Sequence, residues 1–179
     1  MNSAEIAAFA AKLEWGHIPG EVKARARWAF ADTLGVSLAG RRTPAAITSE
    51  RMAMAQTGSA RLTGKRGASS SILAALANGA AASALDFDDG HYLGGGIHPG
   101  APALSSLLSV SSPTTTLGAF LCALTVSYEV TLRAGRLLAP RTPTSEYHTS
   151  GTAGAIGAAV GAAKLLGLDS EGIYRTLCI

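Results

Sequence analysis

Two long stretches of the chain contain no Asp, Glu, Lys or Arg, and they limit the folds that it can adopt. These stretches, residues 67–85 and 90–128, consist mainly of Ala, Gly, Ser, Thr and Leu. In the whole chain only 15% of residues are charged, whereas roughly a quarter is typical of globular domains. Because so few side chains need water, we expect closely packed elements, with some faces covered by a partner chain or by further sequence.

The same stretches raise the question of membrane spans. A span requires about 20 strongly apolar residues, but small and hydroxyl-bearing residues dominate here, and Pro99, Pro102 and Pro113 interrupt the second stretch. We therefore favour buried helices of a soluble protein, with membrane spans as the alternative. Residues 1–15 lack the basic and apolar regions of a secretory signal, so we expect a cytoplasmic location and leave a mitochondrial one open.

Capping signals and apolar residues at helical spacing recur along the chain, and no strand pattern exceeds a few residues. Asn2 with Glu5 three residues later predicts a capping box, and Gly167 predicts a helix C-terminus. The predicted helices cover residues 2–13, 19 or 21 to 40, 70–88, 102–110, 111–138, 151–167 and 169–179, with a loop or weak hairpin at 59–70. The fold class is therefore mostly α, a helical bundle-like single domain over residues 1–179.

Small residues and cysteines describe the expected interior. Ala153, Gly157 and Gly161 lie at helical spacing and predict a crowded core helix; in a membrane the same spacing would mark a dimer contact. Cys122 and Cys178 lie in apolar surroundings without a CxxC motif, so we expect buried, reduced thiols.

The charge balance excludes some partners. The net charge is +3, and Lys and Arg are scattered without a basic stripe. Such a surface argues against nucleic-acid binding. It suits an anionic small molecule instead.

Polar chemistry is concentrated in the segment "DFDDGHYLGGGIHPG", residues 86–100, which holds three of the twelve acidic residues and two of the four histidines. Asp86, Asp88 and Asp89 lie at the predicted end of a helix, where carboxylates oppose the helix dipole. A cation, a metal or a hydrogen-bonded histidine would compensate; a solvated loop with ordinary Asp caps is the alternative. The Asp and His spacing matches no standard metal motif. The three glycines match no phosphate-binding motif, and they suit a close ligand approach or a hinge.

Two histidines precede predicted helices. His98 precedes Pro99, which favours an extended backbone, and a helix begins shortly afterwards. Free N–H groups and the positive dipole end at such a position suit an anion. His148 repeats the arrangement, with Thr149, Ser150 and Thr152 as candidate caps. The pair suggests a cradle for a polycarboxylate, and the alternative is that both histidines are structural.

Five segments together resemble the MmgE/PrpD family, which includes 2-methylcitrate dehydratase, cis-aconitate decarboxylase and iminodisuccinate epimerase. They appear in the family's order and cover most of the chain. The segments are "ADTLGVSLAG" (31–40), "ANGAAASALDFDDGH" (77–91), "HPGAPALSSLL" (98–108), "SYEVTLRAGRLL" (127–138) and "HTSGTAGAIGAAVGAAKLLGL" (148–168).

The resemblance implies a mostly helical large domain and, in full-length members, a smaller α+β lid domain. It also implies homodimers and lyase or isomerase chemistry on small di- and tricarboxylates, without a cofactor or metal. The family's active-site positions carry over to Asp86, His98 and His148, and Thr149 and Ser150 are expected to bind substrate beside His148. His98 and His148 would perform acid–base work and bind carboxylates, while Asp86 would orient a histidine or transfer a proton.

The chain also departs from the family pattern. Family members often carry Thr where this chain has Gly90, and the loop before His98 is glycine-rich here. Typical members are more than twice as long, and their active site uses a lysine from downstream segments, so the chain resembles an N-terminal portion. Dehydratase, decarboxylase and epimerase activities therefore stay open, as do a catalytically silent helical dimerisation module and a metal-dependent enzyme that uses the Asp and His cluster.

Overall fold

The computed structural model describes residues 2–94, 96–138 and 148–178. Within these residues it is built from eight α-helices, two short 3-10 helices and one two-stranded sheet, which confirms the mostly α prediction. The elements are α1 (Ser3–Lys12), η1 (Trp15–His17), α2 (Gly20–Gly40), α3 (Pro44–Met54), β1 (Ala60–Arg61), β2 (Ala68–Ser69), α4 (Ser71–Ser83), η2 (Tyr92–Gly94), α5 (Gly100–Val110), α6 (Leu117–Leu138), α7 (Thr149–Leu165) and α8 (Ser170–Leu177).

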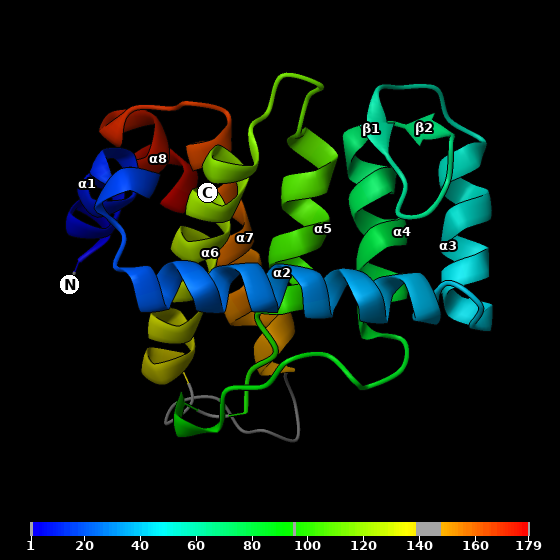
Figure 1. Cartoon of the computed structure of the whole chain (residues 1–179), viewed down its shortest axis with the longest axis horizontal. Helices are drawn as coiled ribbons and strands as arrows, with labels where there is room; N and C mark the ends of the chain where they lie inside the picture. The colour runs from blue at the N-terminus through cyan, green and yellow to red at the C-terminus, as the bar shows by residue number, and fades with distance from the viewer. Residues whose placement is uncertain (1, 95, 139–147, 179) are drawn as a thin grey trace.

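A row of upright helices forms the body of the molecule, and α2 lies across it (Figure 1). Along the row α6 packs on α7, α7 on α5, α5 on α4 and α4 on α3. The long helix α2 contacts α4, α5 and α6, so it packs across most of the row. α1 and α8 pack on each other and cover α7 at one end of the row.

Local signals fix several helix ends as predicted. The Asn2 side chain accepts a hydrogen bond from the Glu5 N–H at 3.0 Å, and Glu5 Oε2 accepts one from the Asn2 N–H at 2.9 Å, which completes the capping box. Asp169 Oδ1 accepts from the Gly172 N–H at 2.8 Å and starts α8. Gly167 has a φ of +76° just after α7, as its predicted role as a C-terminal cap requires.

Other helix ends differ from the predictions. α4 stops at Ser83 rather than reaching the acidic cluster, and Asp86 has a φ of 49°, which no right-handed helix accommodates. α6 starts at Leu117 rather than near Pro113 because the Thr116 hydroxyl accepts from the Ala119 N–H at 3.2 Å and caps the helix there.

One helix was not predicted at all. α3 begins at Pro44, within the stretch between residues 40 and 70 where no helix was predicted. Proline is favoured at the first position of a helix, where its missing N–H costs nothing. Thr43 completes the start, because its hydroxyl accepts from the Ala46 N–H at 3.4 Å.

The contact between α6 and α7 is the most extensive between two described elements. A Cβ on Gly157 would overlap the Thr131 hydroxyl and the backbone of Ser127, and one on Gly161 would lie 2.8 Å from Ser127 Cβ. These small residues let the two helix backbones approach, as the Gly157–Gly161 spacing predicted. The buried apolar side chains around this crossing form two clusters: Ala7, Ala10, Val126, Val130, Val160, Ala163 and Ile173; and Ala103, Leu104, Leu107, Phe120, Leu121, Ala123 and Leu124.

Among the described helices, α6 alone is long and apolar enough to cross a membrane by length and composition. Half of its most apolar window is buried within the molecule. The helix supplies side chains to both core clusters, so it is a core helix of this fold.

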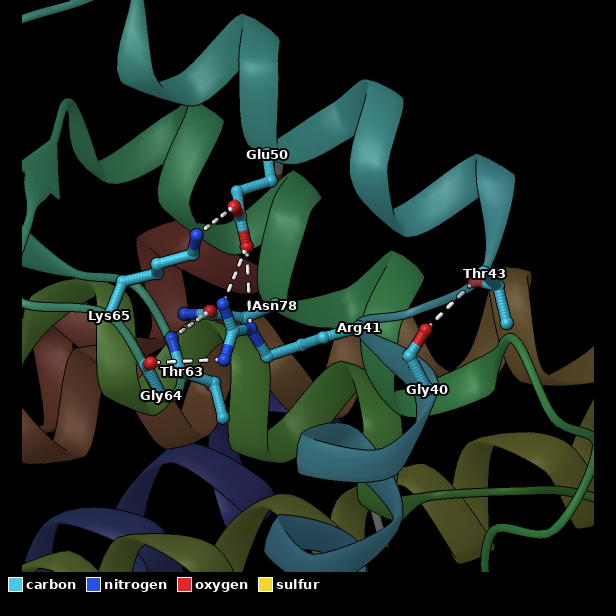
Figure 2. Close-up of polar contacts among 8 residues, drawn as sticks. All are labelled: Gly40, Arg41, Thr43, Glu50, Thr63, Gly64, Lys65 and Asn78. Atoms are coloured by element: carbon cyan, nitrogen blue, oxygen red, sulfur yellow. Dashed lines mark hydrogen bonds and ion pairs between the residues drawn. The ribbon is translucent and has the colours of Figure 1, made fainter.

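The predicted hairpin at 59–70 forms, with β1 and β2 antiparallel and Arg61 opposite Ala68. Asn78 of α4 anchors it: the side-chain oxygen accepts from the Thr63 N–H at 2.8 Å, and the amide donates to the Arg61 carbonyl at 2.9 Å. Figure 2 shows this anchor beside the Glu50 carboxylate, which binds Arg41 at 3.0 Å and Lys65 at 2.8 Å. We call Arg41, Glu50, Lys65 and Asn78 the hairpin cluster.

The cysteine prediction is half right. Cys122 is a buried free thiol in α6, and its Sγ lies 3.4 Å from the Leu13 carbonyl. Cys178 is exposed. It is the residue that ends α8, and its position after the last helical turn leaves its side chain uncovered.

Candidate functional site

The loop that links α4 to α5 carries the acidic cluster and lies on the opposite edge of the molecule from the hairpin (Figure 1). Asp86 is exposed at the start of this loop, and its N–H donates to the Ser83 carbonyl at 3.2 Å. Its carboxylate forms no hydrogen bond or ion pair within the described part of the chain. Of the three aspartates, the one assigned by resemblance is therefore the one most open to solvent.

The loop closes on itself before it reaches His98. The His91 N–H donates to the Ile97 carbonyl at 2.8 Å, and the Ile97 N–H donates back to the His91 carbonyl at 3.1 Å. Ile97 is fully buried and its side chain lies directly against Gly135 of α6. Gly94 and Gly96 thus lie between His91 and Ile97, and Ile97 packs in the core.

His98 is held from several sides. It lies between Ile97 and Pro99, which are both fully buried. The His98 N–H donates to Ser150 Oγ at 2.9 Å, and the ring Nδ1 lies 2.9 Å from the Asp89 carbonyl oxygen. The side chain of His98 retains 25% exposure, so one part of the ring faces outward.

Asp88 and Asp89 lie behind the ring. The side chain of Asp88 is only 5% exposed, and its Oδ1 lies 3.9 Å from His98 Nδ1. Asp89 Oδ1 accepts a hydrogen bond from the Gly100 N–H, the first of α5, at 2.9 Å. The sequence led us to expect a free helix N-terminus for a substrate carboxylate, but Asp89 already occupies part of it. This bond also explains why α5 begins at Gly100 rather than at Pro102.

Burial dominates the electrostatics of Asp89. It raises the pKa of the carboxyl above the ordinary value, and the neighbouring Tyr128 hydroxyl and Gly100 N–H offset this only in part. Burial, followed by the negative charge of Asp89, also raises the pKa of Tyr128 well above its ordinary value. The Tyr128 hydroxyl faces Asp89 and Thr33, yet neither pair meets the geometry of a regular hydrogen bond.

Gly100 lies at the centre of this group. A Cβ there would overlap the Asp89 carboxylate and the Thr33 hydroxyl and would lie 2.9 Å from the Tyr128 hydroxyl. We call Thr33, Asp89, Gly100 and Tyr128 the site cluster. Its members come from four of the five segments that resemble the family, which shows why those segments belong together.

His148 and its neighbours lie at the start of α7. His148 is the exposed residue before the helix and makes no side-chain cap. Thr149 and Ser150 are buried, and their hydroxyls serve the loop rather than the helix: Thr149 Oγ1 donates to the Gly96 carbonyl at 3.2 Å, and Ser150 Oγ receives the His98 N–H. Thr152 donates within its own turn to the Thr149 carbonyl.

The structure therefore joins some predicted site residues and not others. The loop of His98 and the first turn of α7, which follows His148, are tied by two hydrogen bonds. Within the described residues, no hydrogen bond joins Asp86 to either histidine. Sequence reasoning gave no individual role to Asp89 or Tyr128; their place in the resembling segments was the available signal.

Two open hollows reach His91, and neither is lined by Asp86, His98 or His148. One, of about 800 Å³, lies between α2 and α6 against Asp89. The other, of about 910 Å³, lies along α1, α6 and α7. His91 Nδ1 is buried and without a hydrogen-bond partner in the described structure.

The acidic cluster is not arranged as a ligand set. In the described ranges, no three His, Cys, Asp or Glu side chains converge as they would around a metal ion. Asp86 faces solvent, while Asp88 and Asp89 turn toward His98 and Gly100.

The profile of the MmgE/PrpD N-terminal domain matches residues 4–179. No curated protein matches the chain significantly.

Proposed function

Because the chain belongs to the MmgE/PrpD family, we propose that it forms part of the active site of a lyase that acts on small di- or tricarboxylates. The observation that carries the proposal is the pair of hydrogen bonds between the His98 loop and the start of α7. They hold the loop of one candidate histidine against the helix turn that follows the other. The side chains of both histidines remain accessible to a ligand.

The chemistry assigned to this pair is proton transfer next to a carboxylate. In a dehydration, one histidine removes the proton from the carbon beside a carboxylate, and the other protonates the departing hydroxyl. In a decarboxylation, CO2 leaves and a histidine delivers the proton that replaces it at carbon. An epimerisation removes a proton from one face and returns it on the other. Each reaction needs acid–base groups and nearby positive charge, and the proposal assigns no cofactor to it.

Asp86 and α7 complete the proposed site. The exposed Asp86 carboxylate is free to take part in proton transfer, and its position offers no support for a role in orienting either histidine. The helix start after His148 provides a positive dipole end for a substrate carboxylate. Thr149 and Ser150 contribute by holding the loop, so their influence on substrate binding is through His98.

The same proposal includes a cytoplasmic homodimer. Several large apolar side chains are exposed, among them Trp28 at 73%, Ile72 at 82% and Leu93 at 91%. A dimer interface would cover some of these side chains, because contiguous apolar patches are typical of protein contacts. These side chains also favour a second candidate function, a catalytically silent helical module whose role is dimerisation.

The test is an NMR assay of the purified chain with cis-aconitate, 2-methylcitrate and an aspartate-derived dicarboxylate, each with and without chelator. We expect chelator-resistant conversion of one substrate, either by the chain itself or after fusion to the C-terminal half of a family member. His98→Ala and His148→Ala should each lower turnover by about 100-fold or more. His17→Ala is the matched control, because His17 is exposed and lies in η1, apart from the site loop and α7.

The outcomes separate the candidates. If both histidine variants keep full turnover in an active protein, the acid–base assignment is wrong. If neither the chain nor the fusion converts any substrate, and the chain sediments as a dimer, the silent module is supported instead. Loss of turnover with chelator would revive the metal-dependent reading.

A further inference from the structure

We propose that Asp89 is a positioning residue for His98. Asp89 holds the His98 imidazole in the tautomer that carries its proton on Nδ1, so that Nε2 is the basic nitrogen. The proposal deepens the acid–base role given to His98 and rests on it for its functional meaning. The structural statement itself can be tested without any substrate.

The tautomer follows from the nature of the partner. The atom 2.9 Å from His98 Nδ1 is the backbone carbonyl oxygen of Asp89. A carbonyl oxygen only accepts hydrogen bonds, so Nδ1 must carry the proton in the neutral ring. A free neutral histidine prefers its proton on Nε2, so the contact selects the less common form. Nε2 then has a lone pair available to accept a substrate proton.

The Asp89 carbonyl stays in place because the residue is anchored at its side chain. Asp89 Oδ1 receives the Gly100 N–H at 2.9 Å, and Gly100 is only two residues beyond His98. The carbonyl of Asp89 thus contacts His98 at one end of the His98–Pro99–Gly100 turn, and its side chain contacts Gly100 at the other. The His98 N–H, held by Ser150 Oγ at 2.9 Å, fixes the turn from its other side.

The anchor is buried and crowded. The fully buried Thr33 and the Tyr128 hydroxyl surround the Asp89 carboxylate, and Gly100 leaves no space for a Cβ between them. The Asp88 carboxylate lies 3.9 Å from Nδ1 with 5% exposure, farther from the ring nitrogen than the Asp89 carbonyl oxygen at 2.9 Å. The Asp89 carbonyl therefore determines the orientation of the neutral ring.

The experiment is a long-range ¹H–¹⁵N correlation spectrum of the whole chain with ¹⁵N-labelled histidine, recorded at a pH where the rings are neutral. This spectrum distinguishes the two neutral tautomers directly, and a His98→Gln sample identifies the His98 signals. We expect wild-type His98 to show the proton on Nδ1. Asp89→Ala should shift His98 to the Nε2–H form or to a mixture. Asp89→Asn retains a side-chain oxygen for the Gly100 N–H and should restore the Nδ1–H form.

Several results would overturn the proposal. Wild-type His98 with its proton on Nε2 would do so without any variant, even if Asp89→Ala fails to fold. A folded Asp89→Ala protein with an unchanged His98 tautomer would also do so. The signals of His17 are the internal control and should stay the same in all samples.

The positioning role of Asp89 and the proposed function can be contradicted independently of each other. An Nδ1–H tautomer in a protein that converts no substrate would contradict the proposed function and leave the positioning role of Asp89 intact. In an active form, Asp89→Ala should lower kcat by about 100-fold with a much smaller change in KM. Conversion that persists while His98 carries its proton on Nε2 would contradict the positioning role alone.

Discussion

The hairpin cluster and the site cluster are both partly buried polar groups, and they differ in how well their members are paired. In the hairpin cluster, Glu50 binds two cations, and Asn78 uses both its oxygen and its amide on the hairpin backbone. In the site cluster, the hydroxyls of Thr33 and Tyr128 are buried and have no hydrogen-bond partner in the described structure.

The pKa shifts of the two carboxyls have opposite signs for this reason. Burial alone raises the pKa of Glu50, but the hydrogen bonds from Lys65 and Arg41 outweigh it, and the pKa lies below its ordinary value. Burial also raises the pKa of Asp89, and its neighbours do not compensate. A fully paired polar network stabilises the fold, whereas an underpaired one is costly and is typical of a functional site.

The largest expected loss of stability comes from replacing Asn78, the best-paired member of the hairpin cluster. Asn78→Ala leaves the buried Thr63 N–H and the partly buried Arg61 carbonyl without their partner. We expect the free energy of unfolding to fall by about 2–4 kcal/mol, as measured by denaturant titration. The control is Ser83→Ala in the same helix, where the exposed hydroxyl bonds only to Gly79. Equal stability of the two variants would show that the hairpin cluster does not stabilise the fold.

The next effect tests the crowding of the site cluster. Gly100→Ala forces a Cβ into the Asp89 carboxylate and should lower the free energy of unfolding by about 1–3 kcal/mol. It should also abolish the Nδ1–H signal of His98. Gly79→Ala is the matched change, since its Cβ would meet Ser105 Oγ at 3.4 Å and it gains helix propensity. If both alanines are tolerated alike, Asp89 is not held as tightly as the structure shows.

The pH dependence of the free energy of unfolding tests the role of Glu50 in the hairpin cluster. The pKa of Glu50 is lower in the folded chain than in the unfolded chain. Its stabilisation is therefore present above the unfolded pKa and is lost as the pH falls through the folded pKa. Glu50→Gln should lower the free energy of unfolding by about 1 kcal/mol near neutral pH. The difference from wild type should vanish on acidification; a constant difference would contradict the role of its charge.

The smallest expected change in the free energy of unfolding concerns Asp89, and it has the opposite sign. The pKa of Asp89 is raised in the folded chain, so its contribution to stability is fully present below the unfolded pKa and is lost as the pH rises through the folded pKa. Ionisation of the buried carboxylate is a cost to the folded chain, and Asp89→Asn removes that cost. We expect an unchanged or slightly higher free energy of unfolding, by up to about 1 kcal/mol. A clear loss of stability at neutral pH would place Asp89 in the same class as Glu50.

The sequence by itself determined the features that depend on near neighbours. The capping box of Asn2 and Glu5 and the Gly167 helix end were both predicted and are both present, because each depends on residues within a few positions. The mostly α fold and the tight α6–α7 crossing followed from periodicity and small residues. The missed helix α3 had a local signal too, the proline at its first position.

The tertiary structure decided which polar residues of the 86–100 segment are built into the site. Three aspartates within four residues are alike in sequence, yet Asp86 faces solvent while Asp89 caps α5 and contacts His98. That choice depends on a hydrogen bond between His98 and Ser150, 52 positions apart, and on the hydroxyls that α2 and α6 bring to Gly100. Burial and partners at such separations arise only when the helices pack, and they set the pKa of a carboxyl and the tautomer of a histidine.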